Sequence, residues 1–248
     1  MTNTLIMKAI IMAGGRGERL RPITDTIPKP MIDINGKPVL EHIIDLFKKF
    51  GIKEFIFTLC HLPHVVTSYF GDGSKFGIQI DYLIENLKKP MGTAGGIVMA
   101  KKYIDDTFIV TSGDILRNIN INDIIKFHKQ KNSFVTLNTY KRFGPNPKSI
   151  IRFNKENIVT DFIERPKLSI TQHQQPGTNY DWVNGSFYVM EPEIFNFILK
   201  DQESDFGKDI FPKLLGENKK IYAFPTEDYF VDIGNLEKLE IARKTFHI

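Results

Sequence analysis

The chain has 248 residues, of which 42% are hydrophobic and 25% are charged, and its formal net charge is +4. The length suits one large domain with a full core, and the composition excludes disordered and fibrous proteins. Basic residues are spread along the chain among acidic ones, which argues against the clustered basic stripe of a nucleic-acid-binding protein.

The first 140 or so residues show strand and helix patterns in alternation. Short continuous apolar runs predict buried parallel strands, whereas apolar residues three and four apart predict amphipathic helices. The expected strands are 8–12, 54–59, 78–84, 107–112 and 134–140, and the expected helices are 38–50, 63–70, 95–102 and 120–131. Short connections between such elements require right-handed parallel crossovers, so we predict an α/β fold with a Rossmann-like, doubly wound sheet.

After about Phe143 the pattern changes to short strands and polar loops over 150–163, and the composition of 171–181 predicts a surface loop. The remaining expected strands are 182–190, 221–224 and 229–231, and the remaining expected helices are 192–199, 209–215 and 236–244. Because no internal repeat or low-complexity linker interrupts the chain, we expect 1–248 to be a single domain with two lobes, about 1–142 and about 143–248.

The first expected strand runs into a loop that contains three glycines and three arginines, Met12-Ala13-Gly14-Gly15-Arg16-Gly17-Glu18-Arg19-Leu20-Arg21-Pro22. Glycines let a backbone approach a ligand closely, and ligands of α/β proteins bind at the carboxyl ends of parallel strands. The glycines alone would also fit an ordinary turn. The arginines, whose guanidinium groups match phosphate oxygens, favour a phosphate-binding loop.

Two familiar phosphate motifs are excluded. A P-loop needs Gly-Lys followed by serine or threonine, but no Gly-Lys pair of this chain is followed by either, and Pro38 follows Gly36-Lys37. The dinucleotide fingerprint needs a third glycine where Leu20 stands.

Downstream of this loop, Lys29 lies between two prolines in Ile27-Pro28-Lys29-Pro30-Met31. The prolines predict an extended, stiff backbone around the lysine. An ammonium mounted rigidly near three arginines would repel them unless a multivalent anion lay between. The segment therefore favours a triphosphate as ligand.

Two aspartates follow expected strands, Asp114 after Val110-Thr111-Ser112-Gly113 and Asp232 after Phe230-Val231. Either one would also fit a helix cap or turn. A carboxylate flanked by apolar strand residues is costly to bury without a partner. Two carboxylates in one crevice would hold Mg²⁺, with water and phosphate oxygens completing the octahedron.

Together, Ala13-Gly14-Gly15-x-Gly17-x-Arg19-Leu20 and Pro28-Lys29-Pro30-Met31 resemble the signature of the sugar-1-phosphate nucleotidyltransferases, also called nucleotide-sugar pyrophosphorylases. Further pieces occur in the family's order along nearly the whole chain, namely Tyr69-Phe70-Gly71-Asp72-Gly73, Gly92-Thr93-Ala94-Gly95-Gly96, Gly113-Asp114, Glu164-Arg165-Pro166, Asn184-Gly185 and Val231-Asp232-Ile233-Gly234.

The resemblance implies a glycosyltransferase-A-like mixed sheet, with a nucleotide-binding lobe (about 1–142) and a sugar-binding lobe with a closing helix (about 143–248). Many relatives continue into a β-helix domain. Since the sequence ends soon after its last expected helix, we expect no such domain and no acyltransfer activity.

The resemblance also implies a reaction in which a sugar 1-phosphate oxygen attacks the α-phosphorus of a nucleoside triphosphate and pyrophosphate leaves. It implies Mg²⁺ as cofactor, held by Asp114 and Asp232. The implied catalytic residues are Arg19, Lys29 and Asp114. The implied nucleotide-binding residues are Ala13, Gly14, Gly15, Arg16, Gly17, Gly92 and Thr93. The implied sugar-phosphate-binding residues are Glu164, Arg165 and Asn184, with Arg165 where the family usually has lysine.

The form of the motif Pro90-Met91-Gly92-Thr93-Ala94-Gly95-Gly96 most resembles the guanylyl-transferring branch, especially mannose-1-phosphate guanylyltransferases. We therefore expect GTP with mannose 1-phosphate or a related hexose or heptose 1-phosphate. Thymidylyl or uridylyl transfer to glucose 1-phosphate, or transfer to a phosphorylated alcohol or amino sugar, is left open. Glu85 is not carried over as a base-reading residue, because the segment 85–90 is longer than in the family.

A non-catalytic, nucleotide-sugar-binding regulator is the alternative from another class. Such a protein would be expected to lose at least one residue of the catalytic or metal set, yet all of them are present. The single cysteine, Cys60, cannot form a disulfide within the chain, and no signal peptide or long apolar run is found. We expect a cytoplasmic enzyme, with neither nucleic acid nor membrane as partner; a homo-oligomer is left open.

Overall fold

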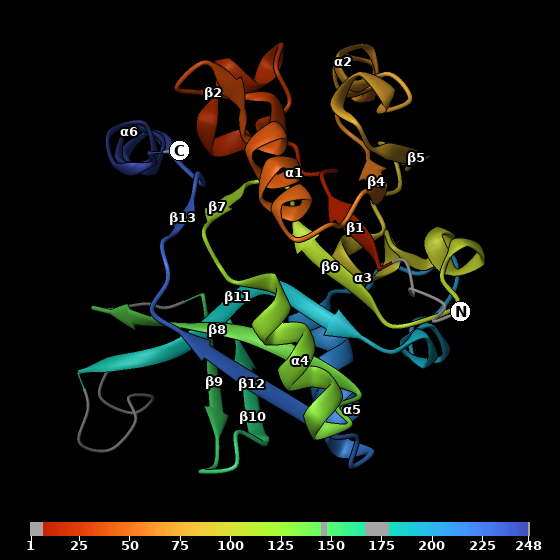
Figure 1. Cartoon of the computed structure of the whole chain (residues 1–248), viewed down its shortest axis with the longest axis vertical. Coiled ribbons are helices and arrows are strands. Elements are labelled where there is room, and N and C mark those ends of the chain that lie inside the picture. The colour runs from red at the N-terminus through yellow and green to blue at the C-terminus, as the bar shows by residue number, and fades with distance from the viewer. Residues whose placement is uncertain (1–6, 145–147, 167–178, 248) are drawn as a thin grey trace. The chain divides into compact units, whose positions relative to one another are not determined.

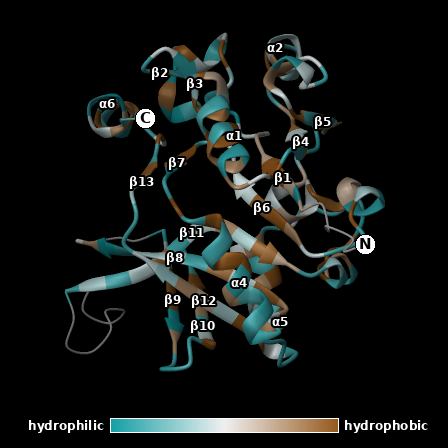
Figure 2. Ribbon diagram, in the orientation of Figure 1, coloured by the Kyte–Doolittle hydropathy of each residue, from teal (hydrophilic) through white to brown (hydrophobic). Residues whose placement is uncertain are grey.

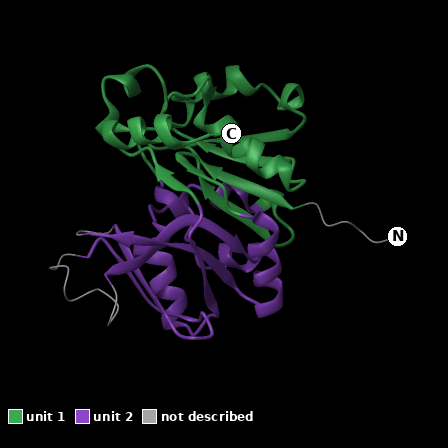
Figure 3. Ribbon diagram, turned by 60° about the vertical axis from the view of Figure 1, so that its left-hand side comes forward, with its two compact units in different colours: residues 1–90, 102–119, 229–248 green, residues 91–101, 120–228 purple. Residues whose placement is uncertain are grey.

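A computed structural model describes residues 7–144, 148–166 and 179–247, and the chain divides into two compact units (Figures 1 and 3). Unit 1 contains residues 1–90, 102–119 and 229–248, and unit 2 contains residues 91–101 and 120–228. Each unit is thus assembled from segments that are far apart in the sequence, whereas the sequence suggested one boundary near 143. The loop expected over 171–181 lies mostly outside the described residues.

Unit 1 is built on parallel strands in the order β6-β1-β4-β5. Their bounds are β1 (Lys8–Met12), β4 (Glu54–Leu59), β5 (Gln79–Ile84) and β6 (Phe108–Ser112). Ile10 of β1 lies opposite Ile56 of β4 and Val110 of β6, and all three are buried. These continuous apolar runs form a parallel sheet, as predicted. The loops that follow β1 and β6 therefore begin at the same edge.

Unit 1 also contains the helices α1 (Val39–Lys49), α2 (Pro63–Phe70) and α6 (Leu236–Thr245). Helix α1 buries Leu40, Ile44 and Phe47 on one face and places Lys48 and Lys49 in its last turn, where they complement the helix dipole. All three helices were predicted. The short 3₁₀ helices were not, and they are η1 (Glu18–Leu20), η2 (Ile23–Asp25), η3 (Lys29–Met31) and η4 (Ser74–Phe76).

Short antiparallel pairs complete unit 1. Strand β2 (Asp33–Ile34) pairs with β3 (Lys37–Pro38), and β7 (Ile115–Arg117) pairs with β13 (Phe230–Asp232). Of these strands only β13 was expected. In the second pair Asp232 lies opposite Ile115, so the end of β13 is held beside the turn that follows β6.

In unit 2, strand β8 (Val135–Phe143) pairs in parallel with β12 (Ile221–Thr226) and antiparallel with β11 (Tyr180–Met190). The mixed strand directions agree with the expected mixed sheet. A second antiparallel pair is formed by β9 (Ser149–Phe153) and β10 (Val159–Glu164). Helix α4 (Ile121–Lys131) begins after Asn120, whose side chain accepts a hydrogen bond from Asn122 N. Figure 2 shows hydrophobic and hydrophilic bands along α1 and α4, as expected of amphipathic helices.

Three helices expected within 91–216 differ from the prediction. In place of a helix over 95–102 the chain forms α3 (Gly92–Gly95) and the 3₁₀ helix η5 (Val98–Tyr103). Two adjacent glycines at 95 and 96 weaken a continuous α-helix here. The helix expected over 192–199 is the 3₁₀ helix η7 (Pro192–Asn196). The helix expected over 209–215 begins earlier, as the π-helix η8 (Phe206–Ile210) followed by α5 (Phe211–Gly216). Among the described residues, no helix combines the length and apolar composition needed to cross a membrane.

Candidate active site

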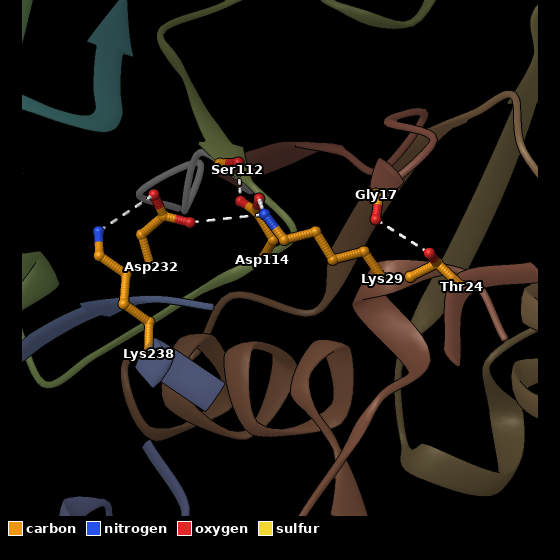
Figure 4. Close-up of polar contacts among 7 residues, drawn as sticks. All are labelled: Gly17, Thr24, Lys29, Ser112, Asp114, Asp232 and Lys238. Carbon is orange, nitrogen blue, oxygen red and sulfur yellow. Dashed lines mark hydrogen bonds and ion pairs between the residues drawn. The ribbon is translucent and has the colours of Figure 1, made fainter. Parts of the chain in front are cut away.

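The loop after β1 owes its shape to Gly17, whose φ of 66° lies in the left-handed region. A Cβ at this position would lie 2.8 Å from Thr24 Cγ2. The Thr24 hydroxyl donates a hydrogen bond of 2.9 Å to the Gly17 carbonyl oxygen (Figure 4). Leu20 is fully buried and anchors the far end of the loop. Around Gly15, in contrast, a Cβ would meet no atom within 4 Å. The glycine-rich segment is therefore a packed turn with an open backbone at Gly15.

The three arginines of the loop point to different partners. Arg16 Nη2 donates to the Leu87 carbonyl oxygen at 3.0 Å. Arg21 forms an exposed ion pair of 3.2 Å with Asp25. Arg19 Nη2 would lie 3.2 Å from a Cβ built on Gly234, next to the end of β13. Arg19 is thus the arginine of this loop that reaches the segment carrying Asp232.

The structure differs from two expectations about Lys29, its backbone conformation and the partner of its ammonium. Lys29 does not lie in extended backbone, because it begins the 3₁₀ helix η3, closed by a hydrogen bond of 2.8 Å from Met31 N to Pro28 O. Pro28 itself is extended, and the fixed φ of Pro30 suits the tight turn. Nor does the ammonium depend on an external anion for a partner, as the sequence suggested. It donates to Asp114 Oδ2 and lies 3.4 Å from Asp232 Oδ1 (Figure 4).

The pairing of β7 with β13 brings the two aspartates together. Asp114 follows β6 in a turn and accepts a hydrogen bond from Ser112 Oγ on its Oδ1. Ile233 N donates to Asp114 O at 3.2 Å, which ties the end of β13 to this turn. Lys238 of α6 places its Nζ 3.8 Å from Asp232 Oδ2 (Figure 4). Asp114 and Asp232, which lie 118 residues apart in the chain, therefore converge on the Lys29 ammonium.

Charge balance explains how these groups are tolerated in a largely buried place. The side chains of Lys29 and Asp232 are only 12% and 9% exposed, and buried charges are stable only when they are paired. Burial by itself lowers the pKa of Lys29, but the charges of Asp114 and Asp232 outweigh it, so the pKa is raised above its ordinary value. Lys29 therefore stays charged at neutral pH and lies between the two carboxylates as their shared partner.

Asp114 and Asp232 also suit a divalent cation. Both carboxylates approach one point, and the Lys29 ammonium between them shows that this point is favourable for positive charge. Over residues 7–144, 148–166 and 179–247, no group of three or more histidine, cysteine or acidic side chains could hold a metal ion. A pair of carboxylates is a poor site for zinc and fits Mg²⁺, which keeps several waters and binds through few protein ligands.

In unit 2, Gly92 and Thr93 are fixed against the segment that precedes η8. Gly92 has a φ of 74°, and a Cβ there would lie 2.4 Å from Ser204 O, so the position requires glycine. The Thr93 hydroxyl donates to Asp205 Oδ2 at 2.7 Å and accepts from Phe206 N at 3.0 Å. The loop predicted to contact the base is therefore held by both backbone and side-chain contacts.

Glu164 ends β10 and packs against η8, where its Oε2 would lie 2.6 Å from a Cβ on Gly207. Burial, followed by the charge of Asp205, raises the pKa of Glu164 to about 7. The neighbouring Arg165 has a φ of 46°, and its side chain is 89% exposed, with Nε 3.9 Å from Glu164 Oε1. Arg165 and Glu164 thus form a long ion pair that leaves the guanidinium open to solvent.

Asn184 lies in β11 just before an irregularity that separates it from Tyr188. Its Nδ2 donates to the Tyr188 hydroxyl at 2.8 Å, and its Oδ1 accepts from Ser186 N at 2.9 Å. Burial raises the pKa of Tyr188, so this hydroxyl stays neutral. The Asn184 side chain is therefore oriented by residues of its own strand. Any ligand that it binds must share or replace its hydrogen bonds to Tyr188 and Ser186.

The chain is similar to known proteins in both its sequence and its fold. The family model described as "Nucleotidyl transferase" matches residues 8–247. This chain belongs to the nucleotidyl transferase family. It is 34% identical over 242 residues to a UTP–glucose-1-phosphate uridylyltransferase of Synechocystis sp., covering 93% of this chain and 61% of the relative. It is 33% identical over 231 residues to a mannose-1-phosphate guanylyltransferase of Mycobacterium tuberculosis, covering 92% of this chain and 61% of the relative.

Solved structures agree with membership of the nucleotidyl transferase family. HddC from Yersinia pseudotuberculosis, complexed with GMP-PN, superposes with a TM-score of 0.79 at 25% identity over 97% of this chain and all of that one. A putative glucose-1-phosphate thymidylyltransferase from Bacillus anthracis has a TM-score of 0.84 at 19% identity, covering 98% of this chain and 97% of that one, which shows the shared fold alone. The family and the mixed, glycosyltransferase-A-like α/β fold predicted from the motifs are thereby confirmed.

Three further residues contact or adjoin the predicted site residues and were not identified from the sequence. Lys238 contacts Asp232, Tyr188 orients Asn184, and Asp205 links Thr93 to the neighbourhood of Glu164. Asp205 caps a helix that begins at Phe206, earlier than the helix expected over 209–215, so the sequence gave no reason to single it out. Tyr188 and Lys238 carried no sequence signal, because their roles depend on contacts made in the fold.

Proposed function

We propose that this protein transfers a nucleotidyl group from a nucleoside triphosphate to a sugar 1-phosphate in an Mg²⁺-dependent reaction that releases pyrophosphate. The observation that carries the proposal is the convergence of Asp114 and Asp232 on the Lys29 ammonium, in the same unit as the glycine-rich loop. Family membership supports it, and the chain spans 61% of the length of the two curated relatives.

In the proposed reaction an oxygen of the sugar phosphate attacks the α-phosphorus, while the bond from the α-phosphorus to the bridging oxygen of pyrophosphate breaks. No covalent enzyme intermediate is needed, so the protein acts by positioning groups and neutralising charge. Asp114 and Asp232 would hold Mg²⁺, which when bound neutralises phosphate charge. Arg19 and the open backbone near Gly15 would bind the departing pyrophosphate, and Lys29 would contact the reacting phosphates.

The residues of unit 2 would bind the sugar and the base. Glu164 and Asn184 present a carboxyl and an amide, which can exchange hydrogen bonds with sugar hydroxyls. The exposed guanidinium of Arg165 would bind the sugar phosphate, with a planar fork in place of the usual lysine. Gly92 and Thr93 would lie against the base, where their contacts with residues 204–206 fix the backbone.

We favour GTP with mannose 1-phosphate or a related hexose or heptose 1-phosphate. This choice is supported by the motif around Gly92, by the mycobacterial relative and by the similar structure of HddC with GMP-PN. Uridylyl transfer to glucose 1-phosphate is the second candidate, and the 34% identity with the Synechocystis enzyme supports it. The single cysteine supports a cytoplasmic location as part of the same proposal.

A matrix of nucleoside triphosphates against sugar 1-phosphates, read by pyrophosphate release, tests both activity and specificity. For the best pair, Asp114→Asn should lower turnover by about 10²- to 10³-fold, the usual loss for one preorganised electrostatic contact. Asp25→Asn is the matched control, because Asp25 pairs with Arg21 in an exposed place. Turnover near that of the wild type in Asp114→Asn would contradict the assignment. No release with any pair would favour a nucleotide-sugar-binding regulator.

A further inference from the structure

Asp205 makes more contacts than a helix cap requires. Its Oδ1 accepts hydrogen bonds from Gly207 N at 2.8 Å and Lys208 N at 3.1 Å, which is the ordinary capping arrangement. Its Oδ2 is used differently and accepts the Thr93 hydroxyl at 2.7 Å. Asp205 N in turn donates to Asp209 Oδ2 at 2.7 Å. The carboxylate is thus fixed from two directions, and one of its oxygens is devoted to the Gly92–Thr93 loop.

On its other side Asp205 adjoins Glu164, with only a glycine between them. The Glu164 carboxyl packs against Gly207, where an added Cβ would lie 2.6 Å from Oε2 and 3.1 Å from Cδ. Gly207 N is also a donor to Asp205 Oδ1. The absence of a side chain at 207 therefore lets the Glu164 carboxyl approach the turn that holds Asp205, and the like charge of Asp205 disfavours ionisation of Glu164.

We propose that Asp205 is a positioning residue that couples the base-side loop Gly92–Thr93 to the sugar-side carboxyl of Glu164. The inference rests on the proposed function, because that function assigns the base and the sugar to these two places. Since the rigid carboxylate of Asp205 contacts Thr93 and acts on Glu164, ordering of the loop by a nucleotide is transmitted to the group that receives the sugar. All of these residues belong to unit 2.

The coupling has a measurable electrostatic consequence. Burial and then Asp205 disfavour the ionised form of Glu164, whereas Arg165 and Lys148 favour it, and the neighbouring Tyr188 is neutral. With a pKa of about 7, Glu164 changes its charge in the neutral range. An ionised Glu164 accepts hydrogen bonds from sugar hydroxyls on both oxygens, so KM for the sugar 1-phosphate should fall as pH rises through that range.

Asp205→Asn removes the charge and keeps an oxygen for the helix cap. We expect the titration midpoint of Glu164, followed by its carboxyl-carbon resonance in NMR of the whole protein, to fall by about 0.5 to 1 pH unit. The resonance is assigned with Glu164→Gln. The pH profile of KM for the sugar 1-phosphate should move by the same amount, with little change in kcat. Asp209→Asn is the matched control, because it removes the same charge from the same short helix and should leave the Glu164 midpoint unchanged.

Thr93→Val tests the other half of the coupling. It removes the hydroxyl that bonds to Asp205 and should raise KM for the sugar 1-phosphate roughly three- to tenfold, although Thr93 is on the base side. Combined with Asp205→Asn, the two effects should be non-additive, as expected for residues in direct contact. Thermal unfolding of each variant separates these effects from a general loss of folding.

The outcomes distinguish the inference from the function on which it rests. If the wild type turns over no pair of substrates, the proposed function is overturned and the coupling falls with it. If the wild type is active but Asp205→Asn leaves the Glu164 midpoint and the KM profile in place, the role of Asp205 alone is overturned. Additive effects of Thr93→Val and Asp205→Asn on the sugar KM would also overturn it.

Discussion

Replacing Lys29 with methionine keeps the length of the side chain and removes the ammonium between Asp114 and Asp232. Removing one partner of a buried ion pair costs about 3–5 kcal/mol. Here the cost should be smaller, about 2–3 kcal/mol, because Asp114 is 24% exposed and Asp232 keeps Lys238 at 3.8 Å. For a chain of this size that loss corresponds to a fall in Tm of roughly 4–12 °C.

The same change should strengthen metal binding by the free protein. In the wild type a divalent cation must displace the Lys29 ammonium from both carboxylates, whereas in Lys29→Met the carboxylates lack that partner. We therefore expect MgCl₂ to raise the Tm of Lys29→Met by more than it raises the Tm of the wild type, starting from EDTA. No nucleotide is needed for this measurement, so it is independent of turnover.

Calorimetric unfolding in EDTA and along a MgCl₂ titration measures both effects. Lys238→Met is the control, since Lys238 is 34% exposed and contacts Asp232 at a longer distance, and it should lower Tm by less. A Tm of Lys29→Met in EDTA equal to that of the wild type would refute the reasoning about the buried pair. Equal stabilisation of both proteins by Mg²⁺ would refute the competition between ammonium and metal.

Two further predictions concern stability. Gly17→Ala should destabilise the fold by about 1–3 kcal/mol in urea unfolding, because φ is 66° and the new Cβ would lie 2.8 Å from Thr24 Cγ2; Gly15→Ala, in open space, should cost far less. Burial lowers the pKa of His128 below 6.5 despite its bond to Glu191, so the stability it contributes is present above pH 6.5 and is lost as pH falls below it. In urea unfolding at several acidic pH values, the free energy of unfolding of His128→Gln should fall less with decreasing pH than that of the wild type. The same dependence of this free energy on pH in both proteins would argue against His128 as its cause.

The long apolar strands and the amphipathic helices could be predicted from the sequence because their signal is local. Strands β1 and β4 and helix α2 have the expected bounds. The very short strands β2, β3 and β7 were not predicted, because so few residues give only a weak periodic signal; β13, which is equally short, was the exception. They form through pairing with other segments, and in the case of β7 the partner lies more than a hundred residues away.

The candidate site was predictable in its residue types but not in its pairings. Motifs pointed to Lys29, Asp114 and Asp232, yet nothing local shows that the lysine lies between the two aspartates. The sequence pattern also could not show which arginine of the loop lies near Asp232. Arg19 and Arg21 differ in their neighbours in the fold, which are Gly234 for Arg19 and Asp25 for Arg21. From the sequence, an external anion was expected to neutralise the charge of Lys29, whereas in the structure the neutralising carboxylates come from distant segments of the chain.

The origin of unit 1 from three separate segments has a consequence for biosynthesis. Lys29 and Asp232 are 203 residues apart in the chain, and Asp232 belongs to the last segment of unit 1. On the ribosome, which delivers the chain from its N-terminus, the lysine and Asp114 emerge long before Asp232. Asp232 therefore joins Lys29 and Asp114 only after 203 further residues have followed Lys29, and shorter nascent chains contain Lys29 and Asp114 without it.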